Sequence, residues 1–505
     1  MSTGDGWDVD DSERSQLLRD RARRRDEQDE KQAKRAARAE AQAARVREVY
    51  AELLDRAPEH RMQPRIEPVR AVCELLGDPQ RAYPVIHLTG TNGKTSTARI
   101  VERLLREHNL RTGRYTSPHL HSVTERISID GRPISDRAFA DTWDEIAPIV
   151  AIVDGRLAAD GEPALTYFEL LTVMAFAAFA EAPIDVAVVE VGLGGTWDAT
   201  NVVEATVAVV LPISLDHTRM LGDSVAQIAE EKAGIFTEGG YVVMAEQPAE
   251  AAEVLLARAV EHGCTVSREG PEFGVVGRSV ALGGQQVTVQ GVAGEYTDLF
   301  LPLHGEHQAH NLAVAIASVE AFLGNGNQRL DPAVVHTAVA EVSSPGRLEL
   351  VRPSPAVVVD AAHNVAGVQA LVASLDEAFA FRHLVGVVGV LDDKDAETML
   401  EQLEPVLDEV VVTRSSSPRA IPVGDLAEIA QDVFGEDRVQ VVERLDEALV
   451  TAMNATEAAV SDHEGQGGGV LVTGSVTVAA EARLLLRAPA VDAGEGLEHE
   501  QEDVE

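Results

Sequence analysis

The sequence contains very little cysteine and few aromatic residues. Its 505 residues include two cysteines, Cys73 and Cys264, and Phe, Trp and Tyr together make up 4%. Two cysteines cannot build a disulfide framework or a zinc site made of cysteines, and their scarcity is typical of a protein kept in a reducing cytoplasm. Because aromatic side chains are scarce, the hydrophobic cores must consist mainly of Val, Ala and Leu.

Positive charge is also scarce. The chain has 43 Lys and Arg residues against 83 Asp and Glu residues, which gives a formal net charge of −40. This balance argues against a general nucleic-acid partner, because such binding depends on cationic contacts to phosphates. It equally disfavours docking on anionic membrane lipids.

Long apolar stretches and a secretory signal are missing as well. The longest apolar runs, such as residues 170–180, are shorter than the roughly 20 residues that cross a bilayer. The start of the sequence is acidic and contains no apolar segment that could direct secretion. We therefore expect a cytoplasmic protein without membrane or nucleic-acid partners.

The two ends of the chain are polar and charged. Residues 1–45 are predicted to form a charged extension, partly helical or disordered, because from residue 11 the segment is rich in Arg, Glu, Ala and Gln and free of Gly and Pro. Apolar side chains appear at helical spacing only from Val46 onward, so the last turns are expected to dock on the folded body. Residues 488–505 carry seven acidic and no basic residues, which predicts a disordered acidic tail.

Between these ends, Val-rich runs alternate with helical stretches. Such continuous apolar runs are typical of parallel strands buried on both faces. Residues 274–301 differ, because short alternating strands with Gly turns predict a small antiparallel piece. We therefore predict an α/β fold in two domains: a larger one over residues 46–343 with a mostly parallel sheet, and a smaller Rossmann-like one over residues 344–487, joined by a hinge at residues 343–350. The predicted parallel strands are residues 85–88, 185–191, 205–213, 241–246, 356–361, 384–391, 409–414 and 469–474.

A glycine turn follows the first of these strands and precedes a helix predicted from about Thr95 to Glu107. Backbone N–H groups in such a turn form a concavity for phosphate oxygens, and the helix N-terminus adds its positive dipole. Lys94 can reach the outer phosphates, and Thr95 can contact Mg²⁺. The spacing differs from that of the common P-loop, because two residues rather than four separate Gly90 from Gly93. The predicted nucleotide-binding residues are Gly90, Thr91, Asn92, Gly93, Lys94, Thr95 and Ser96.

The turn sequence GTNGKT resembles the nucleotide-binding loop of the Mur ligase superfamily, whose members include ATP-dependent amide ligases. Other segments resemble the motifs of one branch, the bifunctional folylpolyglutamate synthase/dihydrofolate synthases, and they occur in that family's order. The resemblance extends over residues 45–487. The segments are YTSPHL at residues 115–120, LTYFE at 165–169, EVGLGG at 190–195, DATN at 198–201, DH at 216–217, IAEEKAG at 228–234, GEHQ at 305–308, PGR at 345–347, DAAHN at 360–364, DDKD at 392–395 and GS at 474–475.

The resemblance implies a function and a mechanism. Enzymes of this family phosphorylate a carboxylate with ATP and then let the amine of L-glutamate displace the phosphate. The expected acceptors are dihydropteroate and the γ-carboxyl group of reduced folates that carry glutamate, which would place the protein in folate biosynthesis and polyglutamylation. The resemblance further implies an N-terminal P-loop ATPase domain, a C-terminal glutamate-ligase domain, two Mg²⁺ ions and a monomer. Whether a monovalent cation also binds is left open.

The same resemblance implies roles for individual positions. The catalytic residues would be Lys94, Glu190, His217 and Lys232. Mg²⁺ would be bound by Ser117, Glu190, His217 and Lys232. Besides the turn, ATP would contact Asn311, Arg347 and Asp360. The substrate-binding residues would be Ser117, Pro118, His119, Thr166, Tyr167, Phe168, Glu169, Trp197, Asp198, Ala199 and, for the incoming glutamate, His363.

Lys232 is implied to carry a carbamate on its side-chain nitrogen. Electrostatics agree with this, because an unmodified ammonium about 4 Å from Mg²⁺ would cost about 8 kcal/mol at an effective dielectric of about 20. A carbamate reverses the charge and offers oxygen atoms, which Mg²⁺ prefers. Its formation requires a neutral amine, which burial would favour by lowering the lysine pKa. The alternative is an unmodified lysine paired with Glu230 or Glu231.

Three positions depart from the family pattern, and two other functions stay open. Thr95 stands where the family often has Gly, Thr196 where a basic residue is common, and Val365 where Pro commonly follows. None of these departures removes a group that the chemistry requires. A muramyl-type or other amino-acid ligase would share the loop and the hinge but should lack the DATN and EKAGI segments. A non-catalytic scaffold acting through the charged N-terminal segment would need none of the catalytic groups that are present.

Overall fold

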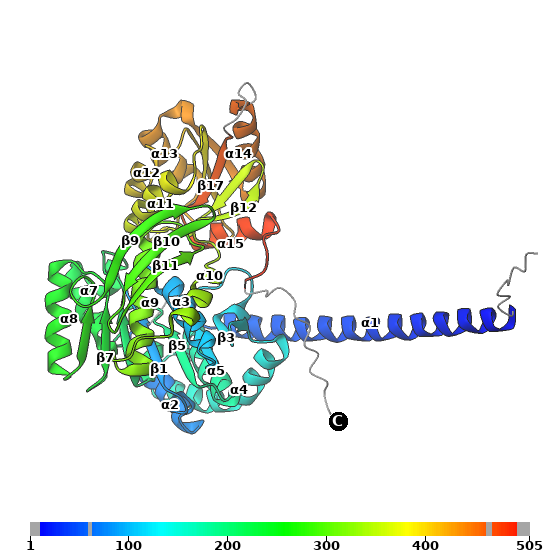
Figure 1. Cartoon of the computed structure of the whole chain (residues 1–505), viewed down its shortest axis with the longest axis horizontal. Helices are drawn as coiled ribbons and strands as arrows, with labels where there is room; N and C mark the ends of the chain where they lie inside the picture. The colour runs from blue at the N-terminus through cyan, green and yellow to red at the C-terminus, as the bar shows by residue number, and fades with distance from the viewer. Residues whose placement is uncertain (1–10, 59–62, 461–466, 492–505) are drawn as a thin grey trace, which may run out of the picture.

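The computed structural model describes residues 11–58, 63–460 and 467–491. Two expectations from the sequence, disorder at the very start and in the acidic tail from residue 492, lie outside these residues. Figure 1 shows two sheets with their helices and one long helix that projects away from them. No helix in the described ranges combines the length and the apolar character needed to cross a membrane.

The larger sheet has eight strands in the order β4-β3-β2-β5-β1-β6-β7-β8. The strands from β2 to β8 in this order are parallel, and β3 and β4 add an antiparallel edge. The prediction of a mostly parallel sheet is therefore confirmed. The strands are β1 (Val85–Thr89), β2 (Thr112–Tyr115), β3 (Ile127–Ile129), β4 (Arg132–Pro133), β5 (Val186–Glu190), β6 (Ala205–Val210), β7 (Tyr241–Met244) and β8 (Thr265–Arg268).

Helices cover both faces of this sheet, which explains why its central strands are apolar on both sides. In β1, Ile86 and Leu88 pack with α3 and α9, whereas Val85 packs with α2, α4 and α5. A further cluster joins β6 and β7 to α7 and α8. The helices are α2 (Glu67–Leu75), α3 (Lys94–Glu107), α4 (Asp136–Ala159), α5 (Tyr167–Glu181), α6 (Thr218–Leu221), α7 (Val225–Lys232), α8 (Ala249–Glu261), α9 (Glu306–Gly324) and α10 (Pro332–Ala340).

A three-stranded antiparallel sheet follows β8 in the chain. It consists of β9 (Gly274–Ala281), β10 (Gly284–Gln290) and β11 (Glu295–Leu301), in the order β11-β10-β9. Val287, Val289 and Leu299 turn toward α9 and join the core on that side of the larger sheet. The predicted antiparallel piece is thus confirmed.

The second large sheet has six strands in the order β12-β13-β17-β14-β15-β16, of which only β12 runs antiparallel to its neighbour. Helices α11, α12 and α13 cover one face, and α14 and α15 cover the other. This arrangement agrees with the predicted Rossmann-like fold. The elements are β12 (Glu349–Pro353), β13 (Ala356–Val359), α11 (Val365–Ala378), β14 (Leu384–Val388), α12 (Ala396–Leu403), β15 (Glu409–Arg414), α13 (Val423–Phe434), β16 (Val439–Arg444), α14 (Leu445–Val460), β17 (Gly469–Thr473) and α15 (Val476–Leu485).

The charged N-terminal segment forms α1 (Asp11–Leu54), a single helix of 44 residues. At 1.5 Å per residue it is about 66 Å long, and Figure 1 shows most of it extending into solvent. Only its end docks: Val49 and Leu53 are fully buried. Arg45 pairs with Asp144 of α4 at 2.5 Å. The helical extension with docked last turns therefore forms as its composition predicts.

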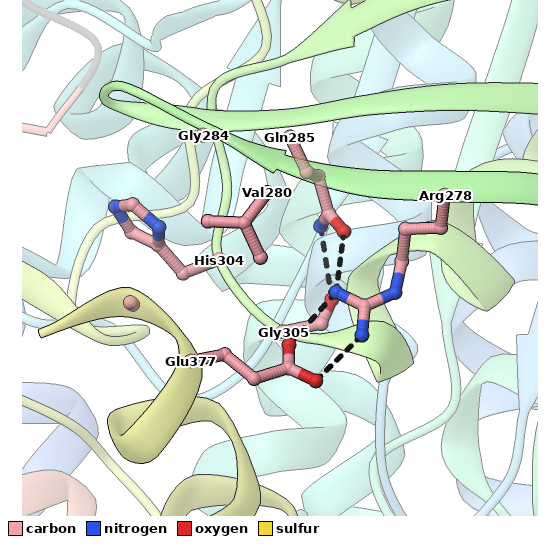
Figure 2. A pocket seen from close by; sticks show the side chains of 8 residues that line it. Arg278, Val280, Gly284, Gln285, His304, Gly305 and Glu377 are labelled. Carbon is pink, nitrogen blue, oxygen red and sulfur yellow. Dashed lines mark hydrogen bonds and ion pairs between the residues drawn. The ribbon is translucent and has the colours of Figure 1, made fainter.

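A polar contact joins the three-stranded sheet to α11. Arg278 of β9 donates to both carboxylate oxygens of Glu377 on α11, at 2.8 and 2.7 Å, and to Gln285 Oε1 at 3.3 Å. The Gln285 amide in turn donates to the carbonyl oxygen of Gly305, just before α9, at 2.9 Å. Figure 2 shows these side chains converging in one small pocket. The contact links the three-stranded sheet to the helix α11 that covers the six-stranded sheet.

Candidate active site

A cavity of about 2000 Å³ lies where the two large sheets meet. Its wall includes the residues that follow β1, β5 and β6 of the eight-stranded sheet and those that follow β13 and β14 of the six-stranded sheet. Ligands of open α/β sheets bind outside the carboxyl ends of the strands. The cavity therefore lies where both sheets are able to present functional groups.

The glycine turn between β1 and α3 forms one part of this wall. Gly90 and Gly93 have positive φ angles of 145° and 88°, which residues with a side chain rarely adopt. A Cβ atom on Gly93 would lie 2.6 Å from Asn311 Oδ1, so the turn and α9 approach each other closely. Lys94 folds back over the turn and donates to the carbonyl oxygens of Gly90 and Thr91 at 3.0 and 3.2 Å.

Glu190 ends β5 and faces the first helical turn of α3. Its two carboxylate oxygens accept hydrogen bonds from the Thr95 hydroxyl at 3.1 and 2.9 Å. The carboxylate also accepts a hydrogen bond from the Ser117 backbone. Burial raises the pKa of Glu190, although Lys94 opposes this effect. The structure therefore brings together Thr95, Ser117 and Glu190. These residues lie far apart in the sequence, and all were predicted to act on Mg²⁺ or phosphate.

His217 and Lys232 reach the same cavity from the segment after β6. His217 has a positive φ of 49°, and burial lowers its pKa to about 4, so its ring is neutral near pH 7. Lys232, the last residue of α7, donates to the Gly90 carbonyl oxygen at 3.0 Å. Burial, followed by repulsion from Lys94, lowers the pKa of Lys232 to about 7. The side-chain amine of Lys232 can therefore lose its proton near pH 7.

The donor atoms fit Mg²⁺, although they do not form a ready cluster. Among the described residues, no group of three or more His, Cys, Asp or Glu side chains is close enough to hold a metal ion. The Glu190 carboxylate nevertheless lies with the hydroxyl of Thr95 and the Ser117 segment at the edge of the turn. These are hard oxygen donors, and Mg²⁺ usually needs only one or two protein ligands because it keeps waters and substrate phosphates.

Side chains from the two sheets meet across the cavity. The amides of Asn92 and Asn364 donate to each other, both at 3.2 Å. Asn364 also donates to Asp216 at 2.9 Å, and Lys394 donates to the other oxygen of Asp216 at 2.6 Å. Burial opposes ionisation of Asp216, but the adjacent Lys394 helps to hold its pKa well below the usual range. The glycine turn is thus linked to the loop after β13, and the segment after β6 is linked to the loops after β13 and β14.

The predicted ATP contacts outside the turn also line the cavity. Asn311, on the first turns of α9, donates to Gln308 Oε1 at 3.1 Å. Asp360, at the end of β13, accepts backbone hydrogen bonds from Leu348 and Ala362, each at 2.8 Å. Burial raises the pKa of Asp360, and Arg347 opposes the shift. Arg347 itself lies in the segment between α10 and β12 and lines the cavity.

Some of the predicted substrate-binding residues line the cavity and others do not. The residues on the wall are Ser117, Pro118, Phe168 and His363. His363 is half-buried, and its desolvation lowers its pKa to about 4. The residues that do not contribute to the wall are His119, Thr166, Tyr167, Glu169, Trp197, Asp198 and Ala199.

The residues off the wall have structural partners instead. Thr166 and Glu169 form a capping box at the start of α5, and Glu169 also accepts from Arg65 at 3.1 and 3.2 Å. Asp198 is fully buried and accepts from the backbone of Leu193 and Thr200, both at 2.9 Å. The contacts of Thr166 and Glu169 stabilise the segment that carries Phe168. The contacts of Asp198 stabilise the turn at residues 192–195.

His119 and Tyr167 belong to a second group that packs against α1. The His119 ring accepts from Arg126 at 3.0 Å. The guanidinium of Arg126 lies over the Tyr167 ring, 5.3 Å from its centroid. Tyr50 of α1 contacts both rings edge to face, at centroid distances of 6.0 and 6.2 Å. The docked end of α1 therefore supports the two segments that carry Pro118 and Phe168.

The sequence analysis did not single out several side chains on the wall. Lys394 and Asn364 lie within recognised motifs, and their positions after strands β14 and β13 could have identified them as site residues. Arg219, Leu215 and Met220, on the segment after β6, carry no such signal, because exposure to the cavity follows only from the path of this loop. His307 lies within the GEHQ segment, and the further wall residues without a sequence signal are Glu246, Gln247, Glu269, His310, Arg419 and Thr477.

Comparisons with known proteins agree with this architecture. Residues 88–319 match the Mur ligase middle domain, and residues 346–476 match the Mur ligase glutamate ligase domain. The chain is 51% identical to the dihydrofolate synthase/folylpolyglutamate synthase of Mycobacterium tuberculosis over 86% of this chain and 92% of that one. It is 33% identical to the Escherichia coli enzyme of the same name over 72% of this chain and 80% of that one.

Solved structures show the same relationship. The folylpolyglutamate synthase of Mycobacterium tuberculosis complexed with ADP and AMPPCP superimposes with a TM-score of 0.84 at 49% identity, covering 89% of this chain and 99% of that one. The folylpolyglutamate synthase of Thermotoga maritima gives a TM-score of 0.74 at 30% identity, covering 88% of this chain and 97% of that one. The chain therefore belongs to the folylpolyglutamate synthase/dihydrofolate synthase family of ATP-dependent Mur ligases.

Proposed function

We propose that the protein uses ATP to join L-glutamate to dihydropteroate and to the γ-carboxyl group of reduced folates that already carry glutamate. The observation that supports this most directly is the shared cavity. There the glycine turn, a buried carboxylate, a buried lysine and a half-buried lysine from the eight-stranded sheet share one wall with a half-buried histidine and a lysine from the six-stranded sheet. Related proteins named for both activities, and a related structure described as an FPGS–AMPPCP–folate complex, support the choice of substrates.

The reaction has two steps in this cavity. An oxygen of the acceptor carboxylate attacks the γ-phosphorus of ATP, which releases ADP and leaves an acyl phosphate. The amine of L-glutamate then attacks the acyl carbon, loses a proton and expels inorganic phosphate to leave an amide. Catalysis of phosphoryl transfer depends mainly on positioning and on neutralising negative charge. The backbone amides from Gly90 to Ser96 and the ammonium of Lys94 fulfil both tasks for the phosphates.

Mg²⁺ would be held by Glu190, Ser117, His217 and Lys232, in two sites. When bound, it neutralises the phosphate oxygens and orients them for attack. Glu190 supplies an anionic oxygen at the edge of the turn, and the neutral His217 ring offers a nitrogen lone pair. We propose that Lys232 is carboxylated, because its amine is neutral in a large fraction of molecules near pH 7.

The second sheet would bind the other partners. We propose that residues 344–487 form the glutamate-ligase domain and residues 46–343 the ATP-binding domain, with ATP between them. Asn311 would contact the adenine, Arg347 and Asp360 the ribose or phosphates, and His363 the incoming glutamate. All four line the cavity. We propose that the protein acts as a monomer in the cytoplasm, because the described residues complete the cavity within a single chain.

Product analysis tests the function. The purified full-length chain is incubated with ATP, Mg²⁺, L-glutamate and either dihydropteroate or tetrahydrofolate, and the products are analysed by mass spectrometry. We expect one added glutamate on dihydropteroate and one or more on tetrahydrofolate, each requiring ATP. Omission of L-glutamate, and its replacement by D-glutamate, are the controls. Turnover of a muramyl-peptide acceptor with no product from either pteroate would contradict the proposal.

A further inference from the structure

Arg219 is an exposed cation on the wall of the cavity that the proposed mechanism does not use. It lies on α6, in the segment that joins His217 to the helix bearing Lys232. In the described part of the chain, its guanidinium has no hydrogen-bond or ion-pair partner. This is notable in a chain whose acidic residues outnumber its basic ones by 83 to 43.

Four of the other lysine and arginine side chains on the wall have hydrogen-bond or ion-pair partners in the protein. Lys394 is paired with Asp216 at 2.6 Å, and Arg419 is paired with Asp393. Arg347 opposes the burial-driven rise in the pKa of Asp360, and in the described residues its guanidinium has no hydrogen-bond or ion-pair partner, but the proposed mechanism assigns it to ATP. The two lysines near the glycine turn donate to its carbonyl oxygens, as described above. Arg219 is thus a wall cation that has no partner among the described residues and no role in the proposed mechanism.

Arg219 has apolar neighbours on its own segment. Leu215 and Met220, its neighbours on the same segment, are 56% and 39% exposed, and both line the cavity. Leu221 and Phe168 continue this apolar part of the wall. An exposed apolar surface beside one unpaired guanidinium suits a ligand with an aromatic body and a peripheral carboxylate, because a guanidinium binds carboxylates through two parallel hydrogen bonds.

The two acceptors of the proposed reaction differ in the number of carboxylates that they carry. Dihydropteroate has a single carboxylate, which is the one to be activated. A folate that carries glutamate has a second one, the α-carboxylate, next to the γ-carboxyl group that reacts. We propose that Arg219 binds this α-carboxylate and so selects glutamate-bearing acceptors over dihydropteroate. This inference rests on the proposed function and adds a specificity residue to it.

Kinetic constants for both acceptors test the role of Arg219. Arg219→Gln should raise the KM for tetrahydrofolate about tenfold, leave kcat within about twofold, and leave the KM for dihydropteroate unchanged within about twofold. Arg219→Lys should retain part of the affinity, because it keeps the charge. The matched control is Arg132→Gln, since Arg132 is also exposed and without a partner in the described residues but does not line the cavity.

An acceptor modified at the α-carboxylate makes the test specific. When this group is converted to an amide, the KM of the wild-type protein should rise to that of Arg219→Gln, and the variant should show no further rise. Equal effects on both acceptors, or additive effects of the variant and the amide, would overturn the inference while leaving the proposed function intact. Absence of turnover with either acceptor in the wild-type protein would instead contradict the proposed function.

Discussion

Lys94 and Lys232 both donate a hydrogen bond to the carbonyl oxygen of Gly90, so one half-buried and one buried amine face the same glycine turn. Like charges at such a separation disfavour each other, and burial disfavours both. Burial lowers the pKa of each residue, to about 7 for Lys232. Lys232 can therefore supply a neutral amine for carboxylation, whereas the proposed mechanism requires Lys94 as a cation for phosphate.

Lys94→Ala should abolish ligase activity without changing the fold. The side chain neutralises phosphate charge and lies in a ligand-binding turn, so its loss removes charge stabilisation in the transition state. We expect a fall in kcat of about a hundredfold to a thousandfold, as for other single groups that stabilise developing charge. Turnover is measured at saturating ATP, with circular dichroism as the control for folding. Unchanged turnover would refute the role assigned to this turn.

Lys232→Ala should also lose activity, but small molecules should restore part of it. If the side chain carries a carbamate, a short-chain carboxylic acid such as acetate can enter the space that the substitution creates and supply the missing oxygens. Recovery is measured as turnover against acetate concentration, with Lys94→Ala, which should not respond, as the control. Crystals grown near neutral pH with ATP, Mg²⁺ and bicarbonate provide a second check. Electron density ending at an unmodified nitrogen would rule out the carbamate.

At the scale of elements, the Val-rich strands were predictable because short continuous apolar runs are typical of parallel strands buried on both faces. The glycine turn was predictable because the order strand, turn and helix is local in the sequence. The direction in which each side chain points was not predictable. Glu169 and Asp198 were expected to face substrate, yet Glu169 pairs with Arg65, which is 104 residues away, and Asp198 caps a buried turn. Such long-range partners leave no local pattern in the sequence.

Helix α1 provides a prediction at this scale. Deletion of residues 1–40 should leave turnover within about threefold, since a tenfold change corresponds to about 1.4 kcal/mol of transition-state energy. The described side chains before residue 41 are exposed, whereas Val49 and Leu53 are buried. Turnover and thermal unfolding are the measurements. A hundredfold loss would show that the projecting part of the helix helps to build the site.

A substitution within the docked end should behave differently. Leu53→Ala removes a fully buried side chain, so we expect unfolding to become easier by about 2–5 kcal/mol. The exposed Leu54, which is 52% accessible, is the matched control, and Leu54→Ala should have little effect. Chemical denaturation of both variants provides the comparison. Equal stabilities would mean that α1 does not pack as the structure shows.

At the scale of the whole molecule, two sheets meet at one cavity, and a few polar side chains connect them across it. Ligand cavities commonly measure about 300–1000 Å³, so a cavity of about 2000 Å³ has room for ATP and an acceptor and also for closure around them. Side-chain contacts such as Asn92 with Asn364 and Arg278 with Glu377 set the relative orientation of the two sheets before they close.

We expect ATP together with a folate acceptor to draw the two sheets closer. Small-angle scattering should show a smaller radius of gyration with both ligands than without them. The variant lacking residues 1–40 is best suited to the experiment, because the long helix would otherwise dominate the scattering at small angles. Identical profiles would indicate that the ligand-free protein is already closed.

The central claim is that the cavity activates a carboxylate as an acyl phosphate, and oxygen labelling tests it most directly. Dihydropteroate labelled with ¹⁸O in its carboxylate is supplied with ATP and L-glutamate, and the released phosphate is analysed by mass spectrometry. The mechanism predicts one ¹⁸O atom in each phosphate released, because the acceptor oxygen that attacks phosphorus leaves with it. Phosphate without label, formed together with the amide product, would contradict the account.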